Sequence, residues 1–355
     1  MITLLVPTMN RSDFLIRFLR YYEEIGFKGC ICIGDGSSPE HVDRTKRVIE
    51  TLRDNLNIVY MEFPDLKVTE NVERLFDLVS TPYAAFLGDD DFLIPSSINK
   101  CMKFLEEHPD YAAAHGKGIS ISLDSGGEFG RVIQCGYYPQ PVMEAGSASQ
   151  RLDDYMSHYS VILFSVHRIE SWRMMIRDIH LLNDRSFGGE LLPCCTSVIL
   201  GKSKELDCLY LVRQDHAQRY LLPLGLDWVA SPEWYPSYLV FRDGLAKSLA
   251  LQDNISLEEA QKVVKQAFCA YLVAYLSSCS RRSRRSPGRW LQVAWKIPGA
   301  RQLWQFLHTM RLKKQSVFSL PALLDPSSPY HADFMPVYKA LTTPPIEFSD
   351  KTTGK

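Results

Sequence analysis

Short apolar runs alternate with segments of helical periodicity over the first 110 residues, and this alternation constrains the fold more than any other feature. The apolar runs are ITLLVP (2–7), CICIGDGSS (30–38, ending in a turn), NIVYMEF (57–63) and YAAFLG (83–88). Between them, apolar residues recur at helical spacing near residues 14–19, 41–55 and 69–80. Short continuous strands separated by helices predict an α/β fold, with a mostly parallel sheet and helices on both faces.

The rest of the chain is less regular. We predict a helix over 96–108, a strand over 111–123 and a loop over the Gly-, Ser- and Pro-rich stretch 124–150. After about residue 230 the pattern becomes helical and then basic. With 355 residues, 46% of them hydrophobic, the chain can form one large domain and a smaller one. We expect a first domain over 1–228 and a mainly helical C-terminal region over 229–355.

Polar clusters follow three of the predicted strands, at Pro7–Arg11, Asp35–Ser38 and Asp89–Asp91. In parallel α/β sheets, ligands bind at the carboxyl ends of the strands. We therefore expect these three clusters to meet at one edge of the sheet.

The triplet Asp89–Asp91 comes directly after an apolar run. Adjacent carboxylates repel one another, so the triplet needs either solvation at a turn or neutralisation by a cation. Mg²⁺ or Mn²⁺ takes one or two carboxylate ligands and completes its shell with phosphate oxygens. The apolar run before the triplet favours a metal site, and a solvated acidic turn is the alternative.

Asp35 lies between two glycines in GDGS (34–37), at the end of a predicted strand. A carboxylate in such a turn approaches a ligand closely and can accept hydrogen bonds from a nucleobase or a ribose. The alternative is an ordinary turn, in which glycine supplies the backbone angles and Asp35 makes local hydrogen bonds.

The motifs PTMNR (7–11), GDGS (34–37) and LGDDDFL (87–93), in this order and at these spacings, resemble those of the family 2 glycosyltransferases. The resemblance implies a GT-A type, Rossmann-like fold and a nucleotide diphosphate sugar as donor. It implies Asp90 as the main metal ligand, with Asp89 and Asp91 in support. The family's usual first aspartates fall on Gly34 and Gly88 here. The residues implied to bind the donor are Pro7, Thr8, Asn10, Arg11, Asp35, Ser37 and Asp89.

The family also implies an inverting reaction, in which an acceptor hydroxyl attacks the anomeric carbon and a general base removes its proton. The base is an Asp or Glu well after the acidic motif. Glu190 is our preferred choice because it follows two glycines and opens an apolar run, and Asp184 is the rival. The alternative for Glu190 is a helix N-terminal carboxylate that is favoured only by the helix dipole.

The cluster VRQDHAQRY (212–220) holds three further site residues. We predict His216 as a metal or diphosphate ligand, although a lone histidine also serves as an ordinary hydrogen-bonding residue. Arg213 and Arg219 are suited to bidentate phosphate binding.

The formal net charge of -1 hides a basic region. No Asp or Glu lies between Glu259 and Asp325, whereas 12 Lys and Arg residues do. Within it, 281–314 mixes arginines with tryptophans, a composition suited to an anionic membrane surface and a lipid-linked acceptor. Packing on the catalytic domain is the alternative. We expect no nucleic-acid partner, because no recognition motif is present.

Several features bear on location and on rival functions. The N-terminal stretch has no basic segment, the late apolar run 267–279 is shorter than the roughly 20 residues that span a bilayer, and the nine cysteines lack metal spacing. We expect a cytoplasmic protein with reduced thiols, peripheral at the inner membrane face.

The rival functions are a sugar nucleotidyltransferase and a non-catalytic nucleotide-sugar binder. PTMNR lacks the Gly-rich triphosphate loop of the former.

Overall fold

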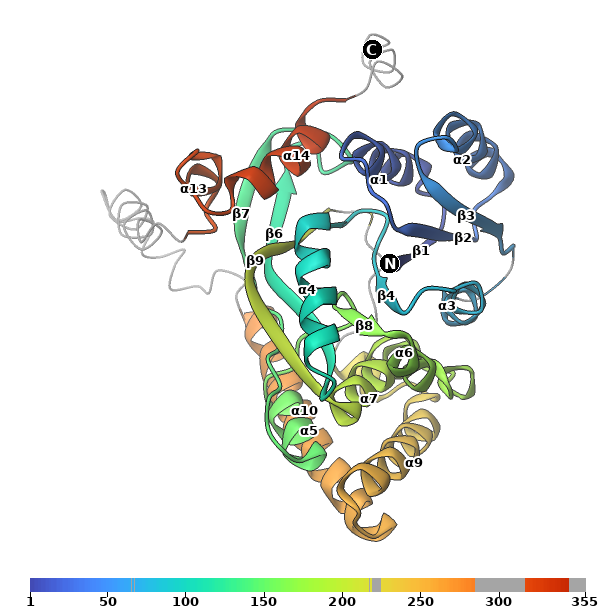
Figure 1. Cartoon of the computed structure of the whole chain (residues 1–355). Coiled ribbons are helices and arrows are strands. Elements are labelled where there is room, and N and C mark those ends of the chain that lie inside the picture. The colour runs from blue at the N-terminus through green and yellow to red at the C-terminus, as the bar shows by residue number, and fades with distance from the viewer. Residues whose placement is uncertain (65, 67, 217, 219–224, 285–316, 345–355) are drawn as a thin grey trace, which may run out of the picture.

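One large sheet with helices packed against it forms the body of the molecule (Figure 1). The structure is a computed structural model, which describes residues 1–355 apart from 65, 67, 217, 219–224, 285–316 and 345–355. The strands are β1 (Ile2–Thr8), β2 (Cys30–Asp35), β3 (Asn57–Glu62), β4 (Tyr83–Phe86), β5 (Phe92–Leu93), β6 (Tyr111–Leu123), β7 (Val132–Tyr138), β8 (Val166–Arg168) and β9 (Lys202–Asp215).

The helices of the first two hundred residues connect these strands. They are α1 (Ser12–Glu24), α2 (Pro39–Leu52), α3 (Val68–Phe76), α4 (Pro95–Glu107), α5 (Ala148–Ser157), α6 (Ile169–Ile176), the short 3-10 helix η1 (Ile179–Leu181), the π-helix η2 (Phe187–Leu191) and α7 (Leu192–Leu200). The later helices are α8 (Leu226–Val229), α9 (Trp234–Asp253), α10 (Leu257–Arg284), α13 (Leu320–Leu324) and α14 (His331–Thr342).

The first four strands pair in parallel, as the sequence predicts. The sheet order is β3-β2-β1-β4-β8-β6-β9-β5, with β7 paired to β6. Thr8 of β1 lies level with Asp35 of β2, and Leu5 lies level with Phe86 of β4. The loops that follow these strands therefore leave the sheet at the same edge.

The second half of the sheet is mixed. β8 runs antiparallel to β4 and β6, whereas β6 and β9 are long parallel partners. The two-residue strand β5 pairs antiparallel with β9, at Leu211 and Val212. This pairing brings the acidic triplet, which directly precedes β5, to the end of β9.

The sequence-based prediction of a loop over 124–150 is wrong in part, because β7 and the start of α5 lie within it. Among the described strands, β7 pairs with β6 alone, and Ile133 and Tyr137 on it are exposed. A strand that is not covered on both faces carries no continuous apolar run, so its sequence lacks the signal of a buried strand.

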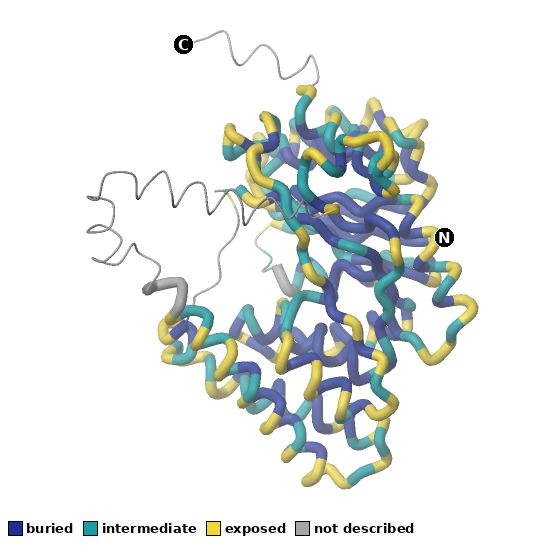
Figure 2. The backbone as a smooth tube through the Cα atoms, turned by 90° about the vertical axis from the view of Figure 1, so that its left-hand side faces the viewer, coloured by how far each residue is buried: buried dark blue, intermediate teal, exposed yellow. Residues whose placement is uncertain are grey.

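The two faces of the sheet carry separate apolar clusters. Along β1, Leu4 and Val6 join one cluster with α1, α4 and α14, whereas Leu5 joins the other with α5, α6, α7, α9 and α10. Figure 2 shows the buried strands at the centre, between helices whose outer sides are exposed. Both clusters draw residues from either side of residue 228, where the sequence predicts a domain boundary; that boundary remains a prediction.

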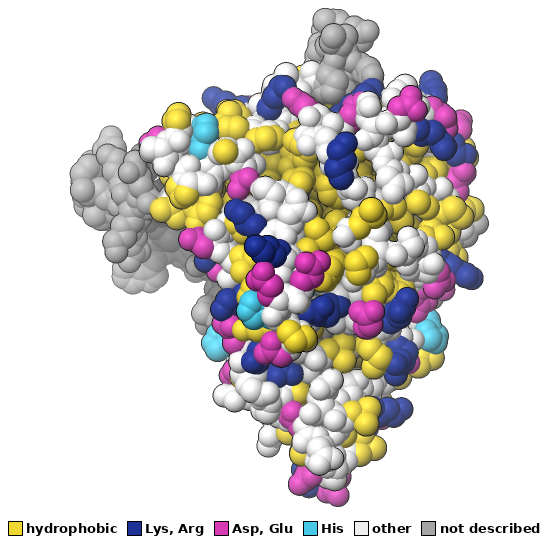
Figure 3. Space-filling view, in the orientation of Figure 1, with side chains coloured by type: hydrophobic (Ala, Val, Ile, Leu, Met, Phe, Trp, Pro, Cys, Tyr) yellow, Lys and Arg dark blue, Asp and Glu magenta, His cyan; other side chains and the backbone are white. Residues whose placement is uncertain are grey.

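The surface carries charges of both signs. In Figure 3, Lys and Arg side chains lie among Asp and Glu side chains on the face that is shown. Within the described residues, every helix is too short or too polar to cross a membrane. Most of the basic segment 281–314 lies outside the described residues. All nine cysteines are unpaired.

Candidate active site

The acidic triplet is buried. Asp89, Asp90 and Asp91 are 0%, 8% and 2% exposed. The alternative of a solvated acidic turn is therefore wrong, because the carboxylates have lost most of their water. Buried carboxylates need hydrogen bonds and opposite charges to remain ionised.

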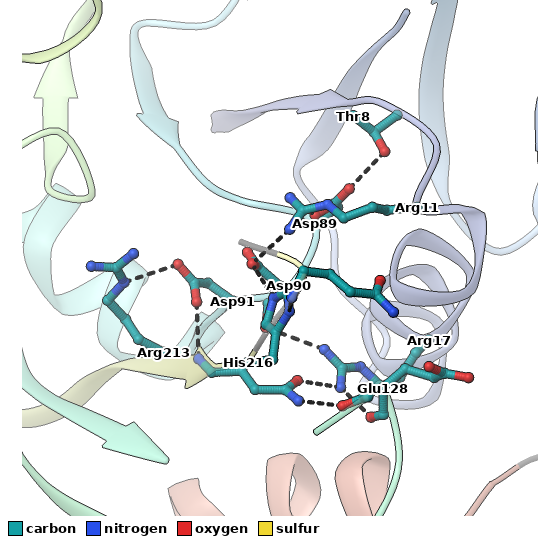
Figure 4. A network of polar contacts seen from close by, with 12 residues as sticks. Thr8, Arg11, Arg17, Asp89, Asp90, Asp91, Glu128, Arg213 and His216 are labelled. Carbon is teal, nitrogen blue, oxygen red and sulfur yellow. Dashed lines mark hydrogen bonds and ion pairs between the residues drawn. The ribbon is translucent and has the colours of Figure 1, made fainter. Parts of the chain in front are cut away.

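Arginine and histidine side chains from distant parts of the chain supply these partners (Figure 4). Arg11 forms ion pairs with both Asp89 and Asp90, the latter at 3.0 Å. His216 Nε2 lies 2.8 Å from Oδ2 of Asp90. Arg213 Nε donates to Asp91 Oδ2 at 3.1 Å. The three acids are thus held by Arg11 just before α1, by Arg213 on β9 and by His216 just after β9.

Neutral donors complete the carboxylate contacts. The Thr8 hydroxyl donates to Asp89 at 2.6 Å, and the backbone N–H of Gln214 donates to Asp91 at 3.0 Å. Both oxygens of Asp91 are thereby engaged, one by Arg213 and one by Gln214. Asp91 points toward β9, whereas Asp90 points toward Arg11 and His216.

Burial and the charged partners shift the pKa values of the three acids in opposite directions. Burial raises the pKa of Asp89 to about 7, against the opposing charge of Arg11. Burial likewise raises the pKa of Asp91 to about 6, against that of Arg213. For Asp90, the penalty of burial is outweighed by the His216 hydrogen bond and the charge of Arg11, which hold its pKa below the usual range. Asp90 is therefore the acid that stays ionised most readily.

Asp35 lies at the end of β2, is 1% exposed, and is fixed by two donors. The Tyr60 hydroxyl donates to its Oδ2 at 2.6 Å, and the backbone N–H of Ser37 donates to its Oδ1 at 2.8 Å. The loop after β1 is bonded to the same turn, since Gly36 N donates to Thr8 O at 3.0 Å and Asn10 N donates to Ser37 Oγ at 2.7 Å.

The three polar clusters do meet at one edge, as predicted. Thr8 joins them, because its backbone carbonyl binds the turn that carries Asp35 and its hydroxyl binds Asp89. Pro7 pairs with Gly34 in the strand register just before this edge. Arg219 lies outside the described residues.

Glu190 lies in η2, at the start of the helical segment that continues as α7, and it is partly accessible to solvent. The Tyr159 hydroxyl donates to it at 2.8 Å. Burial raises the pKa of Glu190, while the Tyr159 hydrogen bond and the charge of Arg213 oppose that rise. Arg213 thus acts electrostatically on Glu190 and also binds Asp91.

Asp184 makes local structural contacts. Its Oδ1 accepts hydrogen bonds from the backbone N–H groups of Ser186 and Phe187, at 2.8 and 3.1 Å, and so caps the start of η2. Its Oδ2 accepts from the indole of Trp228 at 2.9 Å. Asp184 is 8% exposed, and both of its oxygens are engaged.

Sequence reasoning did not identify Tyr60, Tyr159 or Gln214 as residues of the site. Tyr60 lies within a predicted strand, and Tyr159 lies in a segment without a clear pattern. No local signal marks them, because their roles come from contacts with residues 25 and 31 positions away in the chain.

The donor set of the site suits a divalent cation in part. Asp90 Oδ2 and His216 Nε2 converge, and a carboxylate with an imidazole suits Mn²⁺. Within the described residues, however, no group of three or more His, Cys, Asp or Glu side chains is arranged to hold a metal. A cation bound by Asp90 and His216 would take its remaining ligands from water or from donor phosphates.

A comparison with known protein families tests the family that the motifs indicate. Residues 3–167 match the family described as Glycosyl transferase family 2. They form a family 2 glycosyltransferase domain. The matched range contains Asp35 and the triplet, whereas Glu190, Arg213 and His216 lie beyond it.

One solved structure agrees in fold. The S. aureus TarS fragment 1–349 in complex with UDP-GlcNAc superposes with a TM-score of 0.52 at 12% identity, covering 77% of this chain and 72% of that one. A longer S. aureus TarS structure has a TM-score of 0.48 at 12% identity, covering 76% of this chain and 43% of that one. No curated protein in the comparison matches the chain. At 12% identity, the likeness to the first of these structures shows the GT-A fold alone.

Proposed function

We propose that this glycosyltransferase transfers a sugar from a UDP-sugar to an acceptor hydroxyl with inversion, assisted by Mg²⁺ or Mn²⁺. The observation that carries the proposal is the convergence of Asp35, Arg11 and the Asp90–His216 pair at the carboxyl edge of the parallel strands. The similarity to a TarS structure that holds UDP-GlcNAc supports UDP as the nucleotide.

In this proposal Asp35, held by Tyr60, accepts a hydrogen bond from the uracil or the ribose. Asp90 and His216 would hold the cation, which would offset the charge on the departing diphosphate. Asp89 keeps Arg11 and Thr8 in place beside them. Arg11 is a partly exposed cation on the donor side, with 21% of its side chain accessible.

Glu190 is the proposed general base. It is partly accessible, and its raised pKa lies closer to neutrality than that of an ordinary glutamate, which favours proton transfer. Glu190 accepts the acceptor hydroxyl proton as the oxygen attacks the anomeric carbon and UDP leaves. Asp184 fits this role less well, because its oxygens are engaged by the cap of η2 and by Trp228.

The acceptor remains a prediction from composition: a hydroxyl on a glycan or on a lipid-linked sugar. The basic segment 281–314 would bring the enzyme to an anionic membrane surface where such acceptors lie.

Donor binding tests the first part of the proposal. We expect UDP to raise the melting temperature in the presence of Mn²⁺, and GDP and CMP to have little effect. Asp90→Asn should weaken UDP binding by roughly 10- to 100-fold, the usual effect of disturbing a metal site. Asp110→Asn is the control, because Asp110 is exposed and pairs only with Lys202. Equal UDP affinity in wild type and Asp90→Asn would refute the assignment.

Steady-state kinetics test the assignment of Glu190 as the general base. Glu190→Gln should lower kcat by about 10²- to 10⁴-fold while UDP affinity changes little, because the general base is not part of the donor contacts. Asp184→Asn should lower stability more than it lowers kcat of the folded enzyme. The reverse pattern would make Asp184 the base. Donor binding without transfer in wild type, across glycan and lipid-linked acceptors, would instead favour the non-catalytic binder.

A further inference from the structure

Arg17 is a buried cation in α1 that lies behind the acidic triplet. It is 1% exposed, and its guanidinium lies between the rings of Phe14 and Phe92, at 5.2 and 5.0 Å from their centroids. Within the described residues, no carboxylate side chain forms an ion pair with it. Burial lowers the pKa of Arg17 to about 10, against the charges of Asp90 and Asp89, so it remains a cation at neutral pH.

Nη1 and Nη2 of Arg17 donate to three separate segments instead (Figure 4). Nη1 donates to the Glu128 carbonyl and to Gln214 Oε1, the latter at 2.6 Å. Nη2 donates to the Asp90 carbonyl at 3.2 Å. One side chain therefore joins the acidic turn, the end of β9 and the loop 124–131 between β6 and β7.

Gln214 reinforces this connection. Its side-chain amide donates to Gly127 O at 2.6 Å, while its backbone N–H holds Asp91. The loop 124–131 is also bonded on its far side, where Gly130 N donates to Leu341 O of α14 at 3.0 Å. The loop is thus held on one side by the C-terminal helix and on the other by Arg17 and Gln214.

Burying a guanidinium without a paired carboxylate is costly, and an apolar side chain of similar size would also fill the space between two phenyl rings. The retained charge therefore serves the carbonyls that it binds. Those carbonyls belong to Asp90, the residue that contacts His216 and Arg11, and to a loop beside it.

We propose that Arg17 is a positioning residue of the site, which fixes the Asp90 backbone and the loop 124–131 against the end of β9 and thereby sets donor affinity without contacting the donor. The effect on the donor rests on the proposed function. The effect on the loop does not, so the two can be tested separately.

Arg17→Met tests the proposal, since methionine fills the space between the rings but donates no hydrogen bond. Gln214→Met removes the side-chain amide that binds Arg17 and the loop. It keeps the backbone N–H of residue 214, which donates to Asp91. Leu19→Ala is the control for lost stability, because Leu19 is a fully buried core residue on the same helix that takes no part in these contacts. Arg20→Met is the control for lost charge, because Arg20 is on the same helix and pairs with Glu23 near the surface.

The first readout is amide hydrogen exchange in 124–131, which needs no substrate. We expect about tenfold faster exchange or more in Arg17→Met and Gln214→Met, the change that losing one hydrogen bond to a charged group produces. The double variant should add little to either single variant, because the two side chains act as one unit. Leu19→Ala and Arg20→Met should leave exchange in this loop unchanged relative to the rest of the sheet.

The second readout is steady-state kinetics below the melting temperature of every variant. We expect donor KM to rise by about tenfold in Arg17→Met with a smaller change in kcat, and Arg17→Lys to recover part of the loss. A KM rise of the same size in Leu19→Ala would overturn the proposal, as would unchanged loop exchange in both Arg17→Met and Gln214→Met. If wild type neither binds nor turns over a UDP-sugar, the proposed function fails, and loop exchange still decides the positioning role. If Arg17→Met does not fold, Gln214→Met decides both readouts.

Discussion

Buried charge dominates the site at the scale of single residues. Each carboxylate of the triplet is buried and contacts a cationic side chain or an N–H donor. These contacts offset the repulsion among the three carboxylates. Glu190 differs, because within the described part of the chain its carboxylate accepts a hydrogen bond from the Tyr159 hydroxyl alone. A carboxylate with a weak partner keeps a raised pKa and remains available to accept a proton.

Removal of the Tyr159 hydroxyl should shift the pH profile. The Tyr159 hydrogen bond favours ionised Glu190, so Tyr159→Phe raises the pKa of Glu190 further. Because the base must be ionised to act, the acidic limb of the kcat/KM profile should move to higher pH. Tyr155→Phe is the matched control, since its hydroxyl binds Ser160 O instead. An unshifted limb in Tyr159→Phe would argue against Glu190 as the base.

Glu190 should also lower stability at alkaline pH. Its pKa is raised in the folded state, so the folded protein binds this proton more tightly than the unfolded chain does. Stability is then lost as pH rises through the folded-state pKa. Glu190→Gln cannot ionise, so it should melt above wild type at pH 8, with the difference vanishing near pH 4. Melting curves across this range test the sign, and a less stable variant at pH 8 would contradict it.

Close contacts between elements explain the two glycines that replace the family's usual aspartates. A Cβ on Gly34 would lie 2.1 Å from Asn71 Oδ1 of α3, and Asn71 in turn donates to Gly34 O at 3.0 Å. A Cβ on Gly88 would lie 2.4 Å from Asp90 Oδ1. The first glycine lets α3 pack on β2, and the second leaves room for the Asp90 carboxylate.

Gly34→Ala should therefore lower the free energy of unfolding by about 1–3 kcal/mol, the usual cost of overpacking a filled site. Gly36→Ala is the control two residues away, because its Cβ would meet Phe63 O at an ordinary 3.6 Å. Urea unfolding of both variants measures the difference. Equal free energies of unfolding for the two variants would show that α3 shifts to accommodate the Cβ without loss of stability.

At the scale of the whole molecule, the C-terminal helix belongs to the core of the glycosyltransferase fold. Phe334, Val337 and Leu341 of α14 are fully buried and join the cluster of β1, α1 and β9. In Figure 1, α14 lies beside α1 and the ends of β6 and β7, far along the chain from the strands that it covers. The first and last parts of the chain thus stabilise one another.

Phe334→Ala should cost about 3–5 kcal/mol of unfolding free energy, the range for truncating a buried phenylalanine. Because α14 packs on α1, faster hydrogen exchange should extend to α1. Lys339→Ala is the surface control, since its ion pair with Glu24 is exposed on both sides and should contribute less than about 1 kcal/mol. Faster exchange confined to α14, with exchange in α1 unchanged, would show that α14 does not stabilise the rest of the fold.

By itself, the sequence determined the parallel strands β1 to β4, the helices between them, and the edge at which Pro7–Arg11, Asp35 and the triplet meet. Continuous apolar runs and turn residues are local signals, and the carboxyl ends of parallel strands share an edge whatever their length. The motifs also indicated the family that residues 3–167 match.

The tertiary structure alone decided which groups neutralise the triplet. Arg11, Arg213 and His216 are predicted site residues, but their pairing with particular acids is seen only in the folded chain. For Arg213 and His216 the pairing follows from the short strand β5, which aligns the triplet with the end of β9. Arg17 and Tyr159 act through partners more than thirty residues away or on other elements. Contacts across such separations form because they bury side chains and pair opposite charges in the folded chain. They produce no periodic pattern in the sequence.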